Sequence, residues 1–252
     1  MDALAFSAPT TFTQLTLGLS LKEETTFDNF YAGKHVELLS TLKNAVTGCA
    51  EQVIYLCGAQ GEGKSHLLQA CCHYAHQKQQ SAVYLPLAEL LSHQPSEGKS
   101  KEETIGPELL HGLETLSLIC LDDLHLVAGC PAWEEAIFHL YNRLYDTGGR
   151  IVIAARDLPK AIQLTLPDLV SRLTFGMVYP LQPLTDEEKL QVLMMRAQQR
   201  GIKLAAEVGQ YILTHCSRQM NHLVGALNVL DKASLAAQRR LTIPFVKTVL
   251  HI

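Results

Sequence analysis

The chain has 252 residues, of which 47% are hydrophobic and 18% are charged, enough for one sizeable core and a smaller second domain. The 21 basic and 25 acidic residues give a formal net charge of −4, which argues against a broad surface that binds the DNA backbone. Because no apolar run approaches membrane-spanning length and no secretion signal is visible, we expect a cytoplasmic protein without a membrane partner.

Residues 1–24 show no helical period and contain several Thr, Ser and Pro residues, so we expect a flexible N-terminal tail. Within this tail, residues 14–19 read Gln-Leu-Thr-Leu-Gly-Leu and alternate apolar with small side chains. An isolated strand is not stable in water. The segment is therefore expected to add to a sheet or to dock into the pocket of a partner.

From residue 25 to residue 183, short apolar runs alternate with helical periods. The patterns predict strands at 53–57, 82–86, 116–121, 150–155 and 177–181, with helices at 65–78 and 133–146. Strands that alternate with helices indicate a parallel sheet covered on both faces. We therefore expect an α/β domain over residues 25–183.

The strand pattern stops after Pro183. Residues 185–188 read Thr-Asp-Glu-Glu, a capping box that starts a helix, and Gly201 is expected to end it. Further helices are predicted at 205–215 and 219–240, and a last one follows Thr242. Residues 184–252 are therefore predicted to form a smaller, all-helical second domain.

Residues 58–65 read Gly-Ala-Gln-Gly-Glu-Gly-Lys-Ser between a predicted strand and a predicted helix, the setting of a phosphate-binding loop. Gly58, Gly61 and Gly63 let the backbone curl and aim its N–H groups inward, and the helix start adds further donors. Lys64 would reach the β-phosphate, and Ser65 would give a hydroxyl to Mg²⁺. We expect a bound nucleoside phosphate here, the alternative being an ordinary glycine turn before a lysine.

Two carboxylates follow the apolar run 118–121. Asp122 would lie at the carboxyl edge of the sheet, beside the phosphate loop, where it can hold Mg²⁺ together with Ser65. Asp123 could orient an attacking water as a general base. Taken without the phosphate loop, the pair would instead indicate a solvated turn.

Arg172 lies in a short predicted helix whose Leu169 and Leu173 face inward, which leaves its own side chain off the packed face. Such an arginine can act as a finger on γ-phosphate charge, in cis or across a subunit boundary, or it can be an ordinary surface arginine. Arg156 and Asp157 follow the fourth predicted strand, where they could sense the γ-phosphate or pair with each other.

Together these features resemble the AAA+ nucleotide-binding proteins and, among them, the DnaA group of bacterial replication initiators. The resemblance is carried by Thr-Phe-Asp-Asn-Phe-Tyr-Ala-Gly-Lys at 26–34, by 223–227 and by 241–246, and it covers residues 25–252. It implies an AAA+ domain with a helical lid, and ADP or ATP as the nucleotide. The cofactor-binding residues that it implies are Phe27, Phe30, Gly58, Gly61, Glu62, Gly63, Lys64, Ser65, His66 and Asn221.

The sequence differs from the initiators in two ways, and in both it resembles a subgroup of regulatory DnaA paralogues that inactivate the initiator. The chain stops where an initiator would continue into a DNA-binding domain, and residues 14–19 resemble the Q-L-x-L-x-L peptide that docks on the DNA polymerase sliding clamp. This resemblance implies clamp contacts by Gln14, Leu15, Leu17 and Leu19, with DNA contacted only through the clamp. It also implies that Arg172 acts in trans on ATP held by DnaA, while the chain's own nucleotide is a structural switch.

One position departs from the DnaA pattern. Asn221 stands where the lid of the initiators has a sensor arginine, and Arg218, three residues earlier, could substitute for it. Loss of the lid arginine would weaken contact with a γ-phosphate, which favours a diphosphate-binding regulator. Two alternatives stay open: a self-contained ATPase or helicase loader that uses Asp123 as its base, and a nucleotide-binding adaptor that bridges the clamp to another protein. Head-to-tail self-assembly, as in many AAA+ modules, is open as well.

Overall fold

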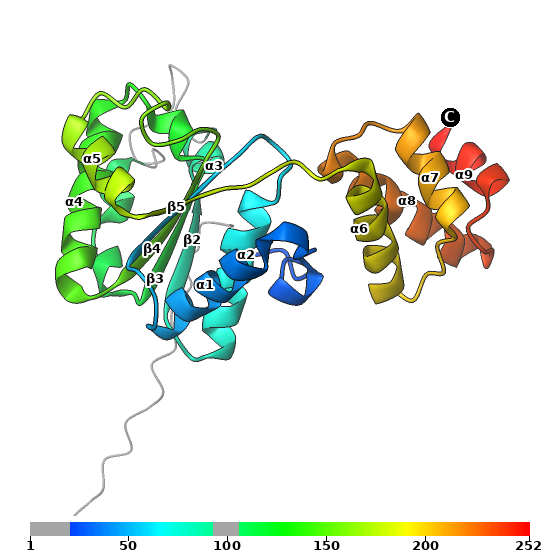
Figure 1. The fold of residues 1–252 in the computed structure, drawn as a ribbon, viewed down its shortest axis with the longest axis horizontal. Coiled ribbons are helices and arrows are strands. Elements are labelled where there is room, and N and C mark those ends of the chain that lie inside the picture. The colour runs from blue at the N-terminus through cyan, green and yellow to red at the C-terminus, as the bar shows by residue number, and fades with distance from the viewer. Residues whose placement is uncertain (1–20, 93–105) are drawn as a thin grey trace, which may run out of the picture.

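The computed structural model describes residues 21–92 and 106–252. The predicted docking segment at 14–19, with Gln14, Leu15, Leu17 and Leu19, lies outside the described residues. The remaining chain forms a sheet domain and a helical domain that lie side by side along the long axis of the molecule (Figure 1).

The sheet has five strands in the order β2-β3-β4-β1-β5, and all neighbouring pairs are parallel. The strands are β1 (Val53–Cys57), β2 (Ala82–Pro86), β3 (Leu118–Asp122), β4 (Arg150–Ala155) and β5 (Met177–Pro180). Every residue of β1 and β3 is buried, as expected for strands covered on both faces. The third strand begins two residues later than predicted, since Leu116 ends a short 3-10 turn.

Helices α1 (Val36–Thr47) and α2 (Lys64–Gln77) cover one face of the sheet, while α3 (Leu87–Ser92), α4 (Pro131–Thr147) and α5 (Pro167–Phe175) cover the other (Figure 1). Successive side chains of β1 point to opposite faces of the sheet, so the strand contributes to a core on each face. Ile54 and Leu56 pack in the α1–α2 core, whereas Tyr55 and Cys57 pack in the opposite core. Single-turn 3-10 segments complete the domain at Phe27–Asn29, Gly33–His35, Pro107–Leu110, Leu113–Thr115 and Leu124–Val127.

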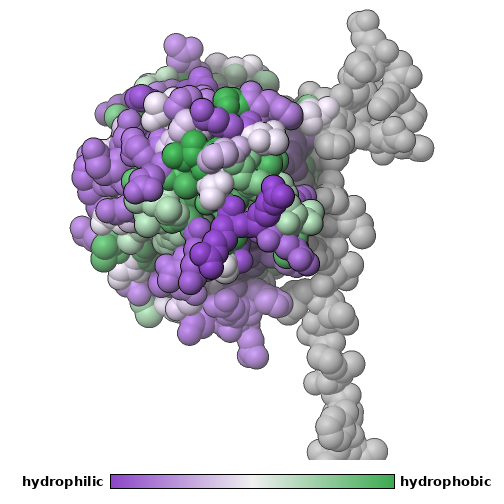
Figure 2. Space-filling model, turned by 90° about the vertical axis from the view of Figure 1, so that its right-hand side faces the viewer, coloured by the Kyte–Doolittle hydropathy of each residue, from purple (hydrophilic) through white to green (hydrophobic). Residues whose placement is uncertain are grey.

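The second domain, called the lid below, consists of α6 (Asp186–Gln199), α7 (Ala206–His215), α8 (Met220–Ala237) and α9 (Ile243–Leu250). It has its own core, in which Leu193, Ile212 and Leu223 are fully buried. Figure 2 looks onto this end of the molecule, where apolar side chains lie among hydrophilic ones. The three-layer sheet domain and the helical lid confirm the fold class predicted from the sequence.

Residues 22–31, called the strap below, lie between α2 and the lid helix α6. The strap is fixed to α2 by Gln69, whose Oε1 accepts from the Lys22 backbone N–H at 3.1 Å and from the Thr25 hydroxyl at 2.9 Å. On the lid side, Arg196 donates to the carbonyl oxygen of Glu24 at 3.2 Å. Residues 21–24, which the sequence pattern assigned to the tail, are thus part of the folded body.

Among the described residues, no helix is both long and apolar enough to cross a membrane.

Candidate functional site

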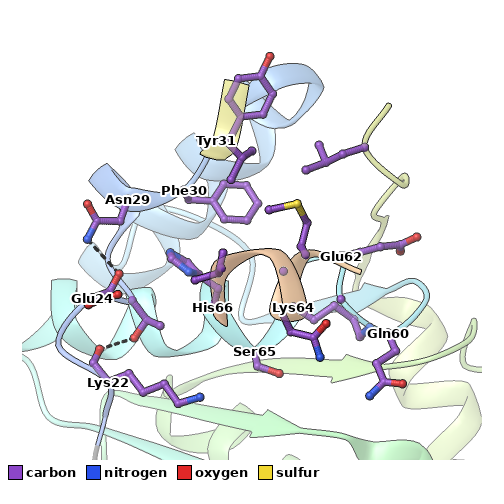
Figure 3. Close-up of a pocket in the computed structure, with 18 of the residues that line it drawn as sticks. Lys22, Glu24, Asn29, Phe30, Tyr31, Gln60, Glu62, Lys64, Ser65 and His66 are labelled. Atoms are coloured by element: carbon purple, nitrogen blue, oxygen red, sulfur yellow. Dashed lines mark hydrogen bonds between the residues drawn. The ribbon is translucent and has the colours of Figure 1, made fainter. Parts of the chain in front are cut away.

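A cavity of about 1010 Å³ opens where the strands β1, β3 and β4 end. Its walls come from the strap, the loop after β1, the segments after β3 and β4, and the lid (Figure 3). The volume suits a ligand the size of a nucleotide. Of the residues singled out from the sequence, the lining includes Phe30, Gly61, Glu62, Gly63, Lys64, Ser65, His66, Asp123, Arg156 and Asn221.

The loop after β1 curls through left-handed backbone conformations. Gly61 has φ +88° and Gly63 has φ +92°. A Cβ at Gly63 would lie 2.7 Å from the Phe30 ring, so this close approach requires glycine. Gly63 is also the N-cap of α2 and has no side chain to satisfy the first N–H groups of the helix. The helix therefore starts with donors available to an anion.

Lys64 is 8% exposed and lies inside this loop. Its ammonium donates to the carbonyl oxygens of Gly58 at 2.6 Å and Ala59 at 2.7 Å. Burial lowers the pKa of Lys64, and the nearby carboxylates of Glu62 and Asp122 oppose that shift. The loop thus holds a cation among carbonyl oxygens, for which phosphate oxygens can substitute.

The carboxylate of Asp122 ends β3 and is 1% exposed. It accepts from the Tyr84 hydroxyl at 2.8 Å and from the Asp123 N–H at 3.0 Å. It does not line the cavity, but the strand register places it at the same edge of the sheet as the phosphate loop, since Leu121 pairs with Ile153 of β4. Among the ion pairs of the described residues none involves Asp122, so no cation of the protein neutralises this carboxylate. Carboxylate and hydroxyl oxygens are the ligand types that Mg²⁺ prefers, and a magnesium site made by Asp122 and Ser65 stays a prediction.

Asp123 lines the cavity in a left-handed conformation with φ +58°. Burial and the neighbouring Asp122 raise its pKa, while His125 and Lys64 oppose the shift. A raised pKa makes a carboxylate a better proton acceptor. Asp123 thus faces the cavity, and its role as a general base stays a prediction.

His66 and Arg196 join the phosphate-loop helix to the lid. The His66 Nε2 lies 2.8 Å from the carbonyl oxygen of Thr26, which assigns the proton to Nε2 and leaves Nδ1 to accept from Arg196 at 3.2 Å. Burial lowers the pKa of His66 to about 4, so the ring is neutral at pH 7. The Phe30 ring lies 5.5 Å from it.

Arg196 is a further residue of the site that no sequence motif marks. Its side chain is 9% exposed, lines the cavity and contacts both Glu24 and His66. The available signal was an arginine three residues after Leu193, on the apolar face of a helix. A charged residue at such a position is expected to have buried partners.

Two of the implied cofactor residues lie outside the cavity lining. Phe27 is buried in the α1–α2 core, with its ring edge-to-face against Tyr74 at 5.8 Å. Gly58 is not among the lining residues, and its carbonyl oxygen accepts from Lys64. Their contribution to the site is indirect, through packing and through the lysine. Arg218 also lies outside the lining and pairs with Asp186 at 3.3 Å, so it does not stand in for Asn221.

Arg172 is exposed on α5 and does not line the cavity of its own chain. Its guanidinium lies 5.9 Å from the centre of the Tyr141 ring, and the Tyr141 hydroxyl donates to its carbonyl oxygen at 3.4 Å. Helix α5 lies on the far side of the sheet domain from the lid (Figure 1). Any action of Arg172 on a nucleotide would therefore concern a nucleotide held by another molecule.

Two family models match the chain. Residues 21–180 match the model of the bacterial DnaA ATPase domain, and residues 186–250 match the model of the Hda lid domain. The two matches meet at the border between the sheet domain and the lid.

Solved structures with the same fold include domain III of the replication initiation protein DnaA from Thermotoga maritima, with a TM-score of 0.75 and 23% identity over 92% of this chain and 98% of that one. AMPPCP-bound DnaA from Aquifex aeolicus has a TM-score of 0.69 and 24% identity over 85% of this chain and 67% of that one. The Thermotoga maritima Holliday junction branch migration motor RuvB has a TM-score of 0.64 and 14% identity, over 90% and 71%.

Proposed function

The chain belongs to the bacterial DnaA ATPase-domain family of AAA+ proteins, and we propose that it is a nucleotide-bound negative regulator of replication initiation that promotes ATP hydrolysis on DnaA. The Hda-type lid over residues 186–250 supports a regulatory paralogue of the initiator. The observation that carries the proposal is the separation of two features within one molecule. The phosphate loop faces the chain's own cavity, whereas Arg172 is exposed on α5, away from it.

The cavity would hold ADP or ATP. The N–H groups of the loop and the ammonium of Lys64 would bind phosphate oxygens, and Phe30 and Asn221 would contribute to the walls. AMPPCP bound to the related DnaA from Aquifex aeolicus supports this ligand class. Mg²⁺ held by Ser65 and Asp122 would neutralise phosphate charge when bound. In this proposal the bound nucleotide mainly stabilises the fold.

Arg172 would act in trans as an arginine finger on ATP bound to DnaA. A guanidinium that stabilises the transition state of phosphoryl transfer raises the rate by about 10³- to 10⁵-fold. The side chain is exposed and supported by the Tyr141 ring, as expected of a group offered to a partner. Gln14, Leu15, Leu17 and Leu19 would dock on the sliding clamp, so that DNA is approached only through the clamp.

The test is hydrolysis of DnaA-bound ATP in the presence of clamp loaded on DNA, with and without this protein. We expect stimulation by the wild type and its loss with Arg172→Ala. Arg240→Ala, an exposed arginine near the end of the lid, is the matched control and should stimulate normally. Unchanged stimulation by Arg172→Ala would refute the finger, and a Gln14→Ala, Leu17→Ala double variant that still binds the clamp would refute the docking segment.

A second function, a self-contained ATPase, is favoured by one observation. Asp123 lines the cavity with a raised pKa, where it could activate water on the chain's own nucleotide. That function requires turnover by the isolated protein that Asp123→Asn abolishes. The regulator requires stimulation of DnaA that Asp123→Asn leaves intact.

A further inference from the structure

Glu134 is a fully buried carboxylate at the start of α4, with 0% of its surface exposed. Among the ion pairs of the described residues none involves it. A buried carboxylate without a cation is stable only where several donors satisfy it. Its donors should therefore reveal what it holds.

All four hydrogen bonds to Glu134 come from two loops. Oε1 accepts from the Gly129 N–H at 2.8 Å. Oε2 accepts from the Thr165 N–H at 2.8 Å, the Thr165 hydroxyl at 2.9 Å and the Leu166 N–H at 2.8 Å. Three of the four bonds thus fix two consecutive residues immediately before α5.

Leu166 is the N-cap of α5, and neither its own side chain nor Pro167 at the first helical position can cap the helix. Glu134 supplies negative charge at this N-terminus, which also suits the helix dipole. Helix α5 is only nine residues long, so the place where it begins determines where its second turn lies. That second turn carries Arg172.

The same helix α4 supports α5 a second time, through Tyr141 beneath the guanidinium of Arg172. Leu169 and Leu173 are fully buried and orient the helix about its axis, but apolar contacts tolerate sliding along that axis more readily than hydrogen bonds do. The bonds to Glu134 supply the missing constraint.

We propose that Glu134 is a positioning residue for Arg172: it fixes the start of α5 and thereby the place at which the guanidinium is presented to the partner's nucleotide. This inference rests on the proposed function. A displacement of about 1 Å in a catalytic group can cost about 100-fold in rate.

The test uses the full chain with clamp loaded on DNA and measures how fast ATP on DnaA is hydrolysed at increasing concentrations of this protein. Glu134→Gln keeps the shape but turns one acceptor oxygen into an N–H donor that faces other donors. We expect a maximal rate lower by about 10- to 100-fold, with an unchanged half-saturating concentration and unchanged ADP affinity. Glu135→Gln, the same change at the exposed neighbour, should behave as the wild type.

The double variant Glu134→Gln, Arg172→Ala separates positioning from general stability. If Glu134 acts through the arginine, the double variant loses no more stimulation than Arg172→Ala alone. Should Glu134→Gln fail to fold, Thr165→Val removes one of the four bonds and should show a smaller loss of the maximal rate with unchanged ADP affinity.

Three outcomes would overturn the proposal. If Arg172→Ala keeps full stimulation, the finger itself is wrong and the positioning role falls with it. If Arg172→Ala is inactive while Glu134→Gln matches Glu135→Gln, only the positioning role is wrong. If the Glu134 or Thr165 variant weakens ADP binding as much as stimulation, its role is a general structural one.

Discussion

Helices α2 and α6 begin in opposite ways. At α6, the Thr185 hydroxyl accepts from the Glu188 N–H at 3.2 Å, and the Glu188 carboxylate accepts from the Thr185 N–H at 2.8 Å. At α2, the N-cap is Gly63, which has no side chain to cap the helix, and the first residues of the helix line the cavity. A helix start that its own side chains satisfy contributes stability, whereas one left open is available for an anion.

The open start also carries an unfavourable feature that the closed one lacks. Burial lowers the pKa of Lys64, so the ammonium in this loop is held at a desolvation cost. The buried ammonium of Lys64 should therefore cost stability in the absence of a ligand, and an anion bound in the loop should offset that cost. Single substitutions at the two helix starts can test this difference between α2 and α6.

The largest effect is expected at Lys64. Lys64→Ala removes the cation from the loop and should weaken ADP binding by about 3–5 kcal/mol, as for other buried charge partners. ADP at 100 times its Kd should add about 2.7 kcal/mol to the stability of the wild type and raise its melting temperature, but not that of the variant. Lys78→Ala, at the other end of α2, should keep the ADP effect. A wild type that ADP does not stabilise would contradict the site.

The next effect concerns His66 and pH. Because its folded pKa is about 4 and the unfolded value is 6.5, the unfolded chain binds the proton more readily in this interval. The contribution of neutral His66 to the free energy of unfolding is therefore fully present above pH 6.5. It is lost as the pH falls towards 4, by about 3 kcal/mol in total. Urea unfolding at several pH values should show a shallower acid slope for His66→Gln than for the wild type. Equal slopes would mean that the ring is not held neutral.

A smaller effect separates two glycines. Gly63→Ala and Gly148→Ala both place a side chain at positive φ, +92° and +78°, which should cost each about 1–2 kcal/mol. Only the Cβ at Gly63 meets the Phe30 ring, while Gly148 has open space around it. Calorimetry should therefore find ADP binding lost in the first variant and retained in the second. Retained binding in both would mean that the loop adapts.

The smallest effect is expected at the start of α6, where Thr185 and Glu188 cap the helix. Thr185→Ala removes the capping box of α6 and should lower the free energy of unfolding by about 1 kcal/mol. The ADP affinity should not change, because Thr185 does not line the cavity. A loss of affinity comparable to that of Lys64→Ala would mean that the lid start belongs to the site.

Local sequence patterns predicted the parts of the molecule that depend on neighbours in the chain. The strands, the glycine curl at 58–63 and the capping box at Thr185 each follow from residues a few positions apart. The edge carboxylates could also be anticipated, since parallel strands bring their carboxyl ends together.

The rest depends on contacts between distant segments. The Arg196 contacts with His66 and Glu24 span 130 and 172 residues, and no local period marks them. Phe27 and Phe30 look equivalent in the sequence, yet a 3-10 turn sends the first into the core and the second to the cavity. Only the three-dimensional arrangement decides which aromatic ring can meet a ligand.

The position of the strap has a consequence for biosynthesis. Its bonds to α2 span 40 to 51 residues, but those to α6 and its C-cap Arg200 span 160 to 176. On the ribosome, the first set can form while much of the chain is still untranslated, whereas the second must wait until α6 has emerged. The wall that joins the phosphate loop to the lid is therefore among the last parts of the protein to mature, although it is among the first to be translated.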